Sequence, residues 1–173
     1  MADVTNALKA IQDTMRKDAG VDGDAQRIGQ LVWMFFLKIF DDREEELALL
    51  DDEYQSPMPL TLRWSAWAAD PEGITGDELL AFVNNKLFPG LKGLNLDVAE
   101  RSRAQVIYSV FQDAINYMKS GTLLRQVINK INDIDFNNLG DRHTFGDVYE
   151  QILRDLQSAG NAGEFYTPRA LTQ

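Results

Sequence analysis

An unusually apolar stretch limits what this chain can fold into more than any other feature of the sequence. Between residues 28 and 40 the hydrophobic side chains recur at spacings of three and four, which is the period of a helix. They cover more than half of the helical circumference: Ile28, Leu31, Val32, Phe35, Phe36, Ile39 and Phe40. Residues 22–24 supply turn and N-cap chemistry just before this stretch. The pattern predicts a largely buried helix over residues 25–50.

An acidic segment follows at residues 41–46, with the order Asp-Asp-Arg-Glu-Glu-Glu. Carboxylates grouped in this way could be imagined as ligands of a metal ion. Because their spacing gives no fixed ligand set, the segment is interpreted as a solvated helix end, and no metal site is expected.

Helical spacing continues through most of the remaining sequence. It predicts helices from residue 4 to near residue 20, and over residues 75–88, 97–120, 122–131 and 144–156. Pro89 and Gly90 are expected to stop the helix over 75–88. The Pro- and Gly-rich residues 51–76 indicate a connector that folds back over the bundle, with a short extended piece at 60–64. Trp64 and Trp67 are expected to pack against the helices. The predicted fold class is all-α, a bundle of about six helices.

Composition excludes several kinds of active site. The 173 residues include no cysteine and a single histidine, His143, so disulfides, thiolate chemistry and zinc sites of usual composition lack their residues. No glycine-rich nucleotide-binding loop follows a strand, and no catalytic residue is proposed. No secretory signal is visible, and the longest apolar run, residues 31–37, is far shorter than the roughly 20 residues that cross a bilayer. A cytoplasmic protein without a membrane segment is expected.

Charge is unevenly distributed along a chain whose formal net charge is −10. Residues 98–131 carry five basic side chains against two acidic ones, a local charge of +3. This segment is either an ordinary solvated helix face or a surface turned toward DNA or an acidic partner. The candidate contact residues are Arg101, Arg103, Lys119, Arg125 and Lys130.

The C-terminal residues begin a new element. A small, flexible link at residues 158–163 leads into the run Gly-Glu-Phe-Tyr-Thr-Pro-Arg at 163–169. Thr167 is an N-cap candidate and Pro168 fits the first turn of a helix, which therefore begins there. Because the sequence stops before that helix completes two turns, we expect the chain to be a truncated piece of a longer protein.

The run at 163–169 closely resembles the segment that opens the catalytic domain in the modification subunits of type I restriction–modification DNA adenine methyltransferases. Two further stretches, residues 33–43 and residues 139–141 followed by 145–153, look similar to the N-terminal helical domain of the same family. The three stretches follow one another in the order that the family requires. The resemblance implies a helical N-terminal domain at residues 1–160, followed at 161–173 by a linker and the start of the catalytic domain.

The resemblance also implies an activity for the parent protein, transfer of a methyl group from S-adenosylmethionine to adenine N6 in DNA. Phe165, Tyr166, Thr167 and Pro168 would form one wall of the cofactor site, with Thr167 in direct polar contact. In the alternative interpretation, the two aromatic residues only pin the linker to the bundle. The sequence lacks the glycine-rich cofactor loop and the Asn-Pro-Pro-Tyr/Phe motif of the family, so these 173 residues alone are expected to be inactive and to hold no cofactor.

Partners follow from the same resemblance. They are the DNA-specificity subunit, a second modification subunit and, in the full complex, the restriction subunit, with DNA bound through the complex. The domain would serve subunit assembly and DNA clamping. Two other functions stay open from the sequence: a free-standing helical protein–protein interaction module, and an autonomous DNA-binding module built on the five basic residues.

Overall fold

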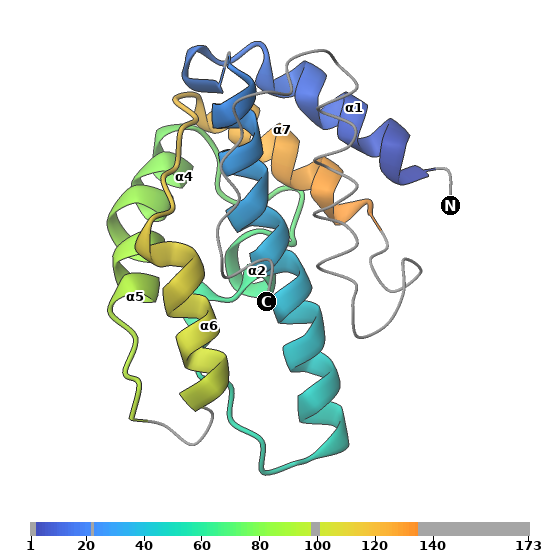
Figure 1. Cartoon of the computed structure of the whole chain (residues 1–173). Coiled ribbons are helices and arrows are strands. Elements are labelled where there is room, and N and C mark those ends of the chain that lie inside the picture. Colours follow the sequence, from blue (N-terminus) through green and yellow to red (C-terminus); the bar gives the residue numbers. More distant parts are fainter. Residues whose placement is uncertain (1–2, 22, 98–100, 135–173) are drawn as a thin grey trace.

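The computed structural model describes residues 3–21, 23–97 and 101–134, and the elements in these ranges are all helical (Figure 1). Their order is α1 (Asp3–Met15), η1 (Ala19–Val21), α2 (Asp24–Leu50), η2 (Leu60–Leu62), α3 (Trp64–Trp67), α4 (Gly76–Phe82), η3 (Val83–Leu87), α5 (Phe88–Lys92), α6 (Arg101–Gln112) and α7 (Gly121–Asn132). No strand occurs in these ranges, and the predicted all-α class is confirmed. The helix expected at 144–156 lies outside the described residues.

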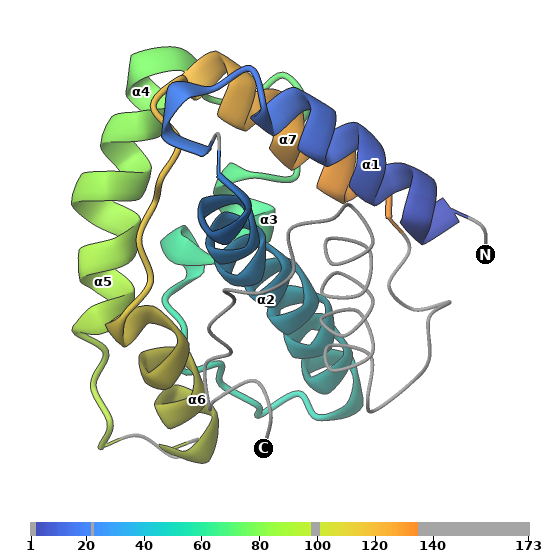
Figure 2. The same ribbon diagram turned by 45° about the horizontal axis from the view of Figure 1, so that its top comes forward.

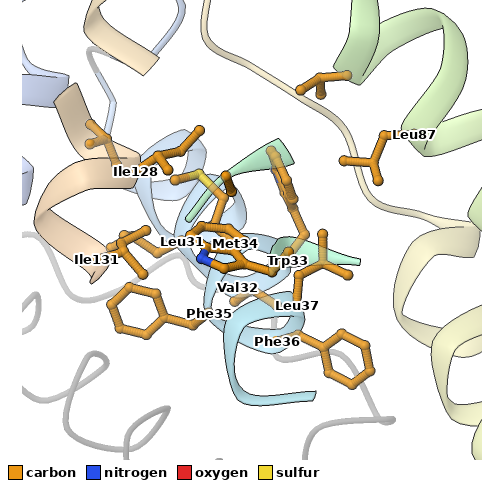
Figure 3. Close-up of a cluster of buried hydrophobic side chains, with 14 of the residues drawn as sticks. Leu31, Val32, Trp33, Met34, Phe35, Phe36, Leu37, Leu87, Ile128 and Ile131 are labelled. Carbon is orange, nitrogen blue, oxygen red and sulfur yellow. The ribbon is translucent and has the colours of Figure 1, made fainter. Parts of the chain in front are cut away.

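Helix α2 forms the centre of the bundle, as its apolar pattern predicts. Figure 2 shows it between α1 and α7 on one side and α4, α5 and α6 on the other. Its apolar side chains lie between Ile128 and Ile131 of α7 and Leu87 of η3 (Figure 3). Trp33 is fully buried, and its ring meets the edge of Phe88 at a centroid distance of 4.9 Å. None of the described helices, α2 included, is long and apolar enough to cross a membrane.

The connector after α2 differs from its prediction in one respect. The expected extended piece at 60–64 is wrong, because Leu60–Leu62 form a 3₁₀ turn and α3 begins at Trp64. Because residues three apart lie on the same face of a helix, α3 places Trp64 and Trp67 on one face, and both are buried. The Nε1 group of Trp64 donates to Asn132 Oδ1 at 2.7 Å, and that of Trp67 donates to the Leu62 carbonyl at 3.1 Å. The predicted packing of both tryptophans against the helices is confirmed.

Pro89 and Gly90 do not end the helix before them, in contrast to the prediction. Helix α4 continues through a π-helical turn, η3, into α5, which ends at Lys92. In a regular α-helix the proline ring would meet the carbonyl four residues earlier. In the π-helical turn, the Phe88 N–H instead donates to the Val83 carbonyl, five residues before it. This wider turn accommodates Pro89 at the start of α5.

The helix predicted over 97–120 ends early, at Gln112. Polar side chains from distant parts of the chain bind the backbone that follows. The Gln30 carbonyl oxygen Oε1 accepts the Tyr117 N–H at 2.7 Å, and the Asp18 carboxylate accepts the N–H groups of Lys119 and Ser120. Because these bonds take the N–H groups that a continuing helix would use, residues 113–120 run as an extended strap to α7. The helix predicted at 122–131 is confirmed as α7, capped by Ser120.

Candidate interaction surface

Helix α6 carries two of the candidate basic residues and no carboxylate. Its inner side is apolar, and Ala104, Ile107, Val110 and Phe111 are buried. The exposed side chains are those of Arg101, Ser102, Gln105, Val106, Tyr108, Ser109 and Gln112. Arg, Ser, Gln and Tyr side chains are the types that bind phosphate oxygens in nucleic-acid complexes. In a chain of net charge −10, this helix face is free of negative charge.

Arg103 is held by buried groups of the fold. Its Nε donates to Glu44 Oε1 at 3.2 Å, and its guanidinium lies 4.6 Å from the centroid of the Phe40 ring. Glu44 is fully buried and also accepts the Tyr54 hydroxyl. Burial, followed by the hydrogen bond to Glu44 and the charge of Glu44, raises the pKa of Tyr54 to about 12. Arg103 therefore neutralises a carboxylate inside the protein.

Asp41 is the second buried carboxylate of the acidic segment. It accepts Arg63 Nε at 2.6 Å and the Ser65 hydroxyl at 3.4 Å. The interpretation of residues 41–46 as a solvated helix end is thus wrong for Asp41 and Glu44, because each faces a basic residue from another element. Glu45 and Glu46 are exposed as expected. The described residues contain no group of three carboxylates or histidines that could hold a metal ion.

Arg125 lies inside the bundle, only 5% exposed. Its guanidinium donates to four backbone carbonyls of the connector at 2.9–3.0 Å: those of Trp67, Ala68, Asp70 and Ile74. Burial lowers the pKa of Arg125, and the nearby charge of Asp70 opposes this effect. The planar guanidinium group of arginine carries several N–H donors in a rigid arrangement, and it can therefore bind several carbonyls together. Arg125 thus fixes the loop at 67–74 against α7.

The five candidate basic residues do not share one face. Lys119 is exposed just before α7, Lys130 is partly buried, and Arg101 is 61% exposed at the start of α6. Figure 1 shows the start of α6 and the start of α7 at opposite ends of the molecule. Arg101 and Lys119 are therefore two separate exposed cations.

The expected cofactor residues, Phe165, Tyr166, Thr167 and Pro168, lie outside the described residues, and so does His143. The same holds for the C-terminal run that carries the strongest motif of the sequence.

A surface pocket that the sequence does not reveal lies beside α6. It has a volume of about 400 Å³, with Asn84, Phe88, Pro89 and Lys92 on one wall and residues 114–116 on the other. The Asn116 amide Nδ2 donates to Asn84 Oδ1 at 3.1 Å. Both walls depend on departures from the predicted helices, namely the π-helical turn and the early end of α6.

Two family comparisons cover most of the chain. Residues 4–131 match the family described as HsdM N-terminal domain, and residues 140–173 match the family described as N-6 DNA Methylase. The two matches follow each other with a short gap and include the described residues from 4 to 131.

Individual relatives agree with these matches. The chain is 64% identical over 170 residues to the type I restriction enzyme EcoEI methylase subunit of Escherichia coli, an alignment that covers 98% of this chain and 35% of that protein. A crystal structure of a modification subunit of a putative type I restriction enzyme from Vibrio vulnificus superposes with a TM-score of 0.80 at 40% identity, over 96% of this chain and 38% of that one.

A second solved structure concerns complex assembly and conformational transition of the type I R-M system. It superposes with a TM-score of 0.74 at 34% identity, over 96% of this chain and 33% of that one. The chain thus spans about a third of the length of the relatives that it matches.

Proposed function

The chain belongs to the family of HsdM N-terminal domains, and from this premise we propose that it is the N-terminal part of a type I modification subunit that methylates adenine N6 in DNA. The observation that carries the proposal is the order of the two family matches, a helical domain over 4–131 and then the beginning of an N-6 DNA methylase over 140–173. The 64% identity to the EcoEI methylase subunit supports the same assignment.

The methyl donor of the parent protein would be S-adenosylmethionine, which supplies the activated methyl group when bound. Phe165, Tyr166, Thr167 and Pro168 are the residues proposed for one wall of its site, with Thr167 as the polar contact. They fall within the part of the chain that matches the N-6 DNA methylase family. We propose a domain boundary near residue 160, and we expect the 173 residues alone to transfer no methyl group and to hold no cofactor.

The helical domain itself would serve subunit assembly and DNA clamping. Its proposed partners are the DNA-specificity subunit, a second modification subunit and the restriction subunit. Helix α6 is the surface that we propose for DNA, because its exposed side combines Arg101 with polar side chains and carries no carboxylate. Arg103, which pairs with the buried Glu44, holds α6 against α2, and the buried Arg125 holds the connector in place.

Methyl transfer tests the proposal directly. The parent protein, assembled with its specificity subunit, is incubated with duplex DNA and S-adenosylmethionine labelled in the methyl group, and the modified nucleoside is identified after digestion. Label in N6-methyladenine is expected, and a version lacking residues 1–160 should lose assembly or DNA retention. Label in a cytosine derivative would count against the proposed activity. Undiminished assembly and DNA binding without residues 1–160 would count against the proposed role of the helical domain.

A further inference from the structure

The pocket beside α6 is built on a rigid apolar floor. Phe88 is buried, and its ring meets Trp33 at 4.9 Å and Phe111 at 5.3 Å in edge-to-face arrangements. Ile115, on the opposite wall, is 52% exposed and is one of the few large apolar side chains in the described residues that face solvent to this degree. An apolar side chain entering from outside would therefore meet a preformed surface.

Fixed amide groups line the same pocket. Fully buried Gln30 of α2 donates through Nε2 to Asn116 Oδ1 at 2.9 Å, and Asn116 donates in turn to Asn84 Oδ1 at 3.1 Å. Gln30 also binds the Tyr117 N–H, so the strap cannot move without breaking a buried hydrogen bond. Within the described residues, the amide nitrogen of Asn84 has no acceptor. It remains available to a carbonyl group from outside.

Charge on the α5 wall is positive. Residues 79–96 contain Lys86 and Lys92 and no Asp or Glu, although the chain as a whole carries −10. The Lys92 ammonium lies 5.9 Å from the centroid of the Phe88 ring, which keeps it at the pocket. The carboxylate nearest in sequence to the lining is that of Asp113, which directly precedes the opposite wall. This asymmetry favours an acidic group on the α5 side and disfavours one on the strap side.

We propose that this pocket docks a segment of a partner subunit that presents an apolar side chain next to an aspartate or glutamate. The apolar side chain packs between Phe88 and Ile115, a backbone carbonyl accepts from Asn84, and the carboxylate pairs with Lys92. A single lysine and an apolar floor match a protein segment rather than a DNA backbone, which would require several cations. The inference rests on the proposed function, since it places this chain in a complex with other subunits.

Site-specific photo-crosslinking tests the docking. In the full-length modification subunit, assembled with its specificity and restriction subunits, Ile115 is replaced by p-benzoylphenylalanine, and captured peptides are identified by mass spectrometry. Capture of a partner segment with an apolar residue within two positions of Asp or Glu is expected. The same replacement at Leu60, which is 74% exposed on η2, is the control and should not capture that segment.

A complex that methylates DNA but captures DNA, a segment without an acidic residue or nothing at position 115 overturns the docking while leaving the proposed function intact. A preparation that neither assembles nor methylates DNA overturns the proposed function, and the docking falls with it.

Charge reversal at the α5 wall tests the acidic character of the partner. In the crosslinking complex, Lys92→Glu should lower the yield at position 115 by about fivefold or more, because like charges then face each other. Lys92→Arg should retain the yield. Lys9→Glu, at an exposed position of α1, makes the same charge change away from the pocket and should also retain it. An unchanged yield with Lys92→Glu would overturn the assignment of an acidic partner segment.

Discussion

The carboxylate of Asp18 accepts the backbone N–H of Lys119 at 3.0 Å, although the two residues are 101 positions apart in the sequence. The same carboxylate accepts the N–H groups of Gly20 and Ser120, both at 2.8 Å, and it is almost fully buried. It thus places a negative charge at the N-terminus of α7, where the helix dipole favours one. One side chain joins the end of α1, the strap and the start of α7.

Replacing this carboxylate should destabilise the fold. Asp18→Ala leaves buried N–H groups without an acceptor, so the free energy of unfolding should fall by about 2–4 kcal/mol. Urea denaturation of the 173-residue chain, followed by circular dichroism, measures the change. Asp13→Ala removes an exposed aspartate that pairs with Arg16 at the surface, and it should change stability by less than about 0.5 kcal/mol. Equal effects of the two substitutions would contradict this assignment.

Gly121 marks a second close contact between distant segments. A Cβ atom at this position would lie 1.8 Å from the carbonyl oxygen of Gly76, so α7 and α4 could not keep their approach. Gly121→Ala should lower the midpoint of thermal unfolding and cost about 2 kcal/mol or more. Gly93→Ala, where the nearest atom would be 3.3 Å away, is the matched control and should cost clearly less.

Tyr54 should be visible in an alkaline titration. Its pKa is raised to about 12 by burial and by the hydrogen bond to Glu44, from the ordinary tyrosine value of about 10. The folded state holds this proton more tightly than the unfolded state, so the contribution to stability is complete below pH 10 and is lost as the pH rises toward 12. Absorbance at the tyrosinate band should show a late component that Tyr54→Phe removes. Tyr108→Phe, on exposed α6, should leave that component in place.

Arg125 should not tolerate exchange for lysine. Its guanidinium group donates hydrogen bonds to four backbone carbonyls of the connector at once, and the ammonium group of a lysine cannot donate to all four. Arg125→Lys should lower the free energy of unfolding by about 1–3 kcal/mol, measured by urea denaturation. Arg101→Lys, at an exposed position, should be neutral within about 0.5 kcal/mol. A neutral Arg125→Lys would show that the loop at 67–74 is held by its packing alone.

The spacing of apolar residues along the sequence was enough to predict the helices whose formation depends on nearby residues alone. Helix α2 follows from the spacing of residues such as Ile28, Leu31 and Phe35, and α7 from a stripe that ends at Ile131. The early end of α6 was not predictable in this way. It depends on Asp18 and Gln30, which bind backbone groups about 90 to 100 residues away. Gln30 offers one usable signal, a polar residue between the apolar Ile28 and Leu31.

The candidate interaction surface was also beyond prediction from local sequence, because it depends on contacts between distant residues. Five basic residues looked equivalent in the sequence, but only burial distinguishes Arg125, which binds backbone carbonyls, from Arg101, which is exposed. Neither periodicity nor local charge indicates that Glu44 lies inside the protein and holds Arg103. The pocket beside α6 also escapes sequence reasoning, because one wall requires the π-helical turn and the other requires the strap.

Arg101 provides the sharpest test of the DNA-facing role of α6. It is 61% exposed, and its pair with Asp97 is long, at 3.9 Å, so removing it should barely affect stability. In the assembled complex, Arg101→Ala should weaken duplex binding by about three- to tenfold at 0.1 M salt. Because one phosphate contact is lost, the slope of log affinity against log salt concentration should fall by about one. Fluorescence anisotropy over a range of salt concentrations measures both quantities, with Lys9→Ala on α1 as the control of equal charge. If both variants shift the slope equally, the effect is one of overall charge, and α6 does not contact DNA.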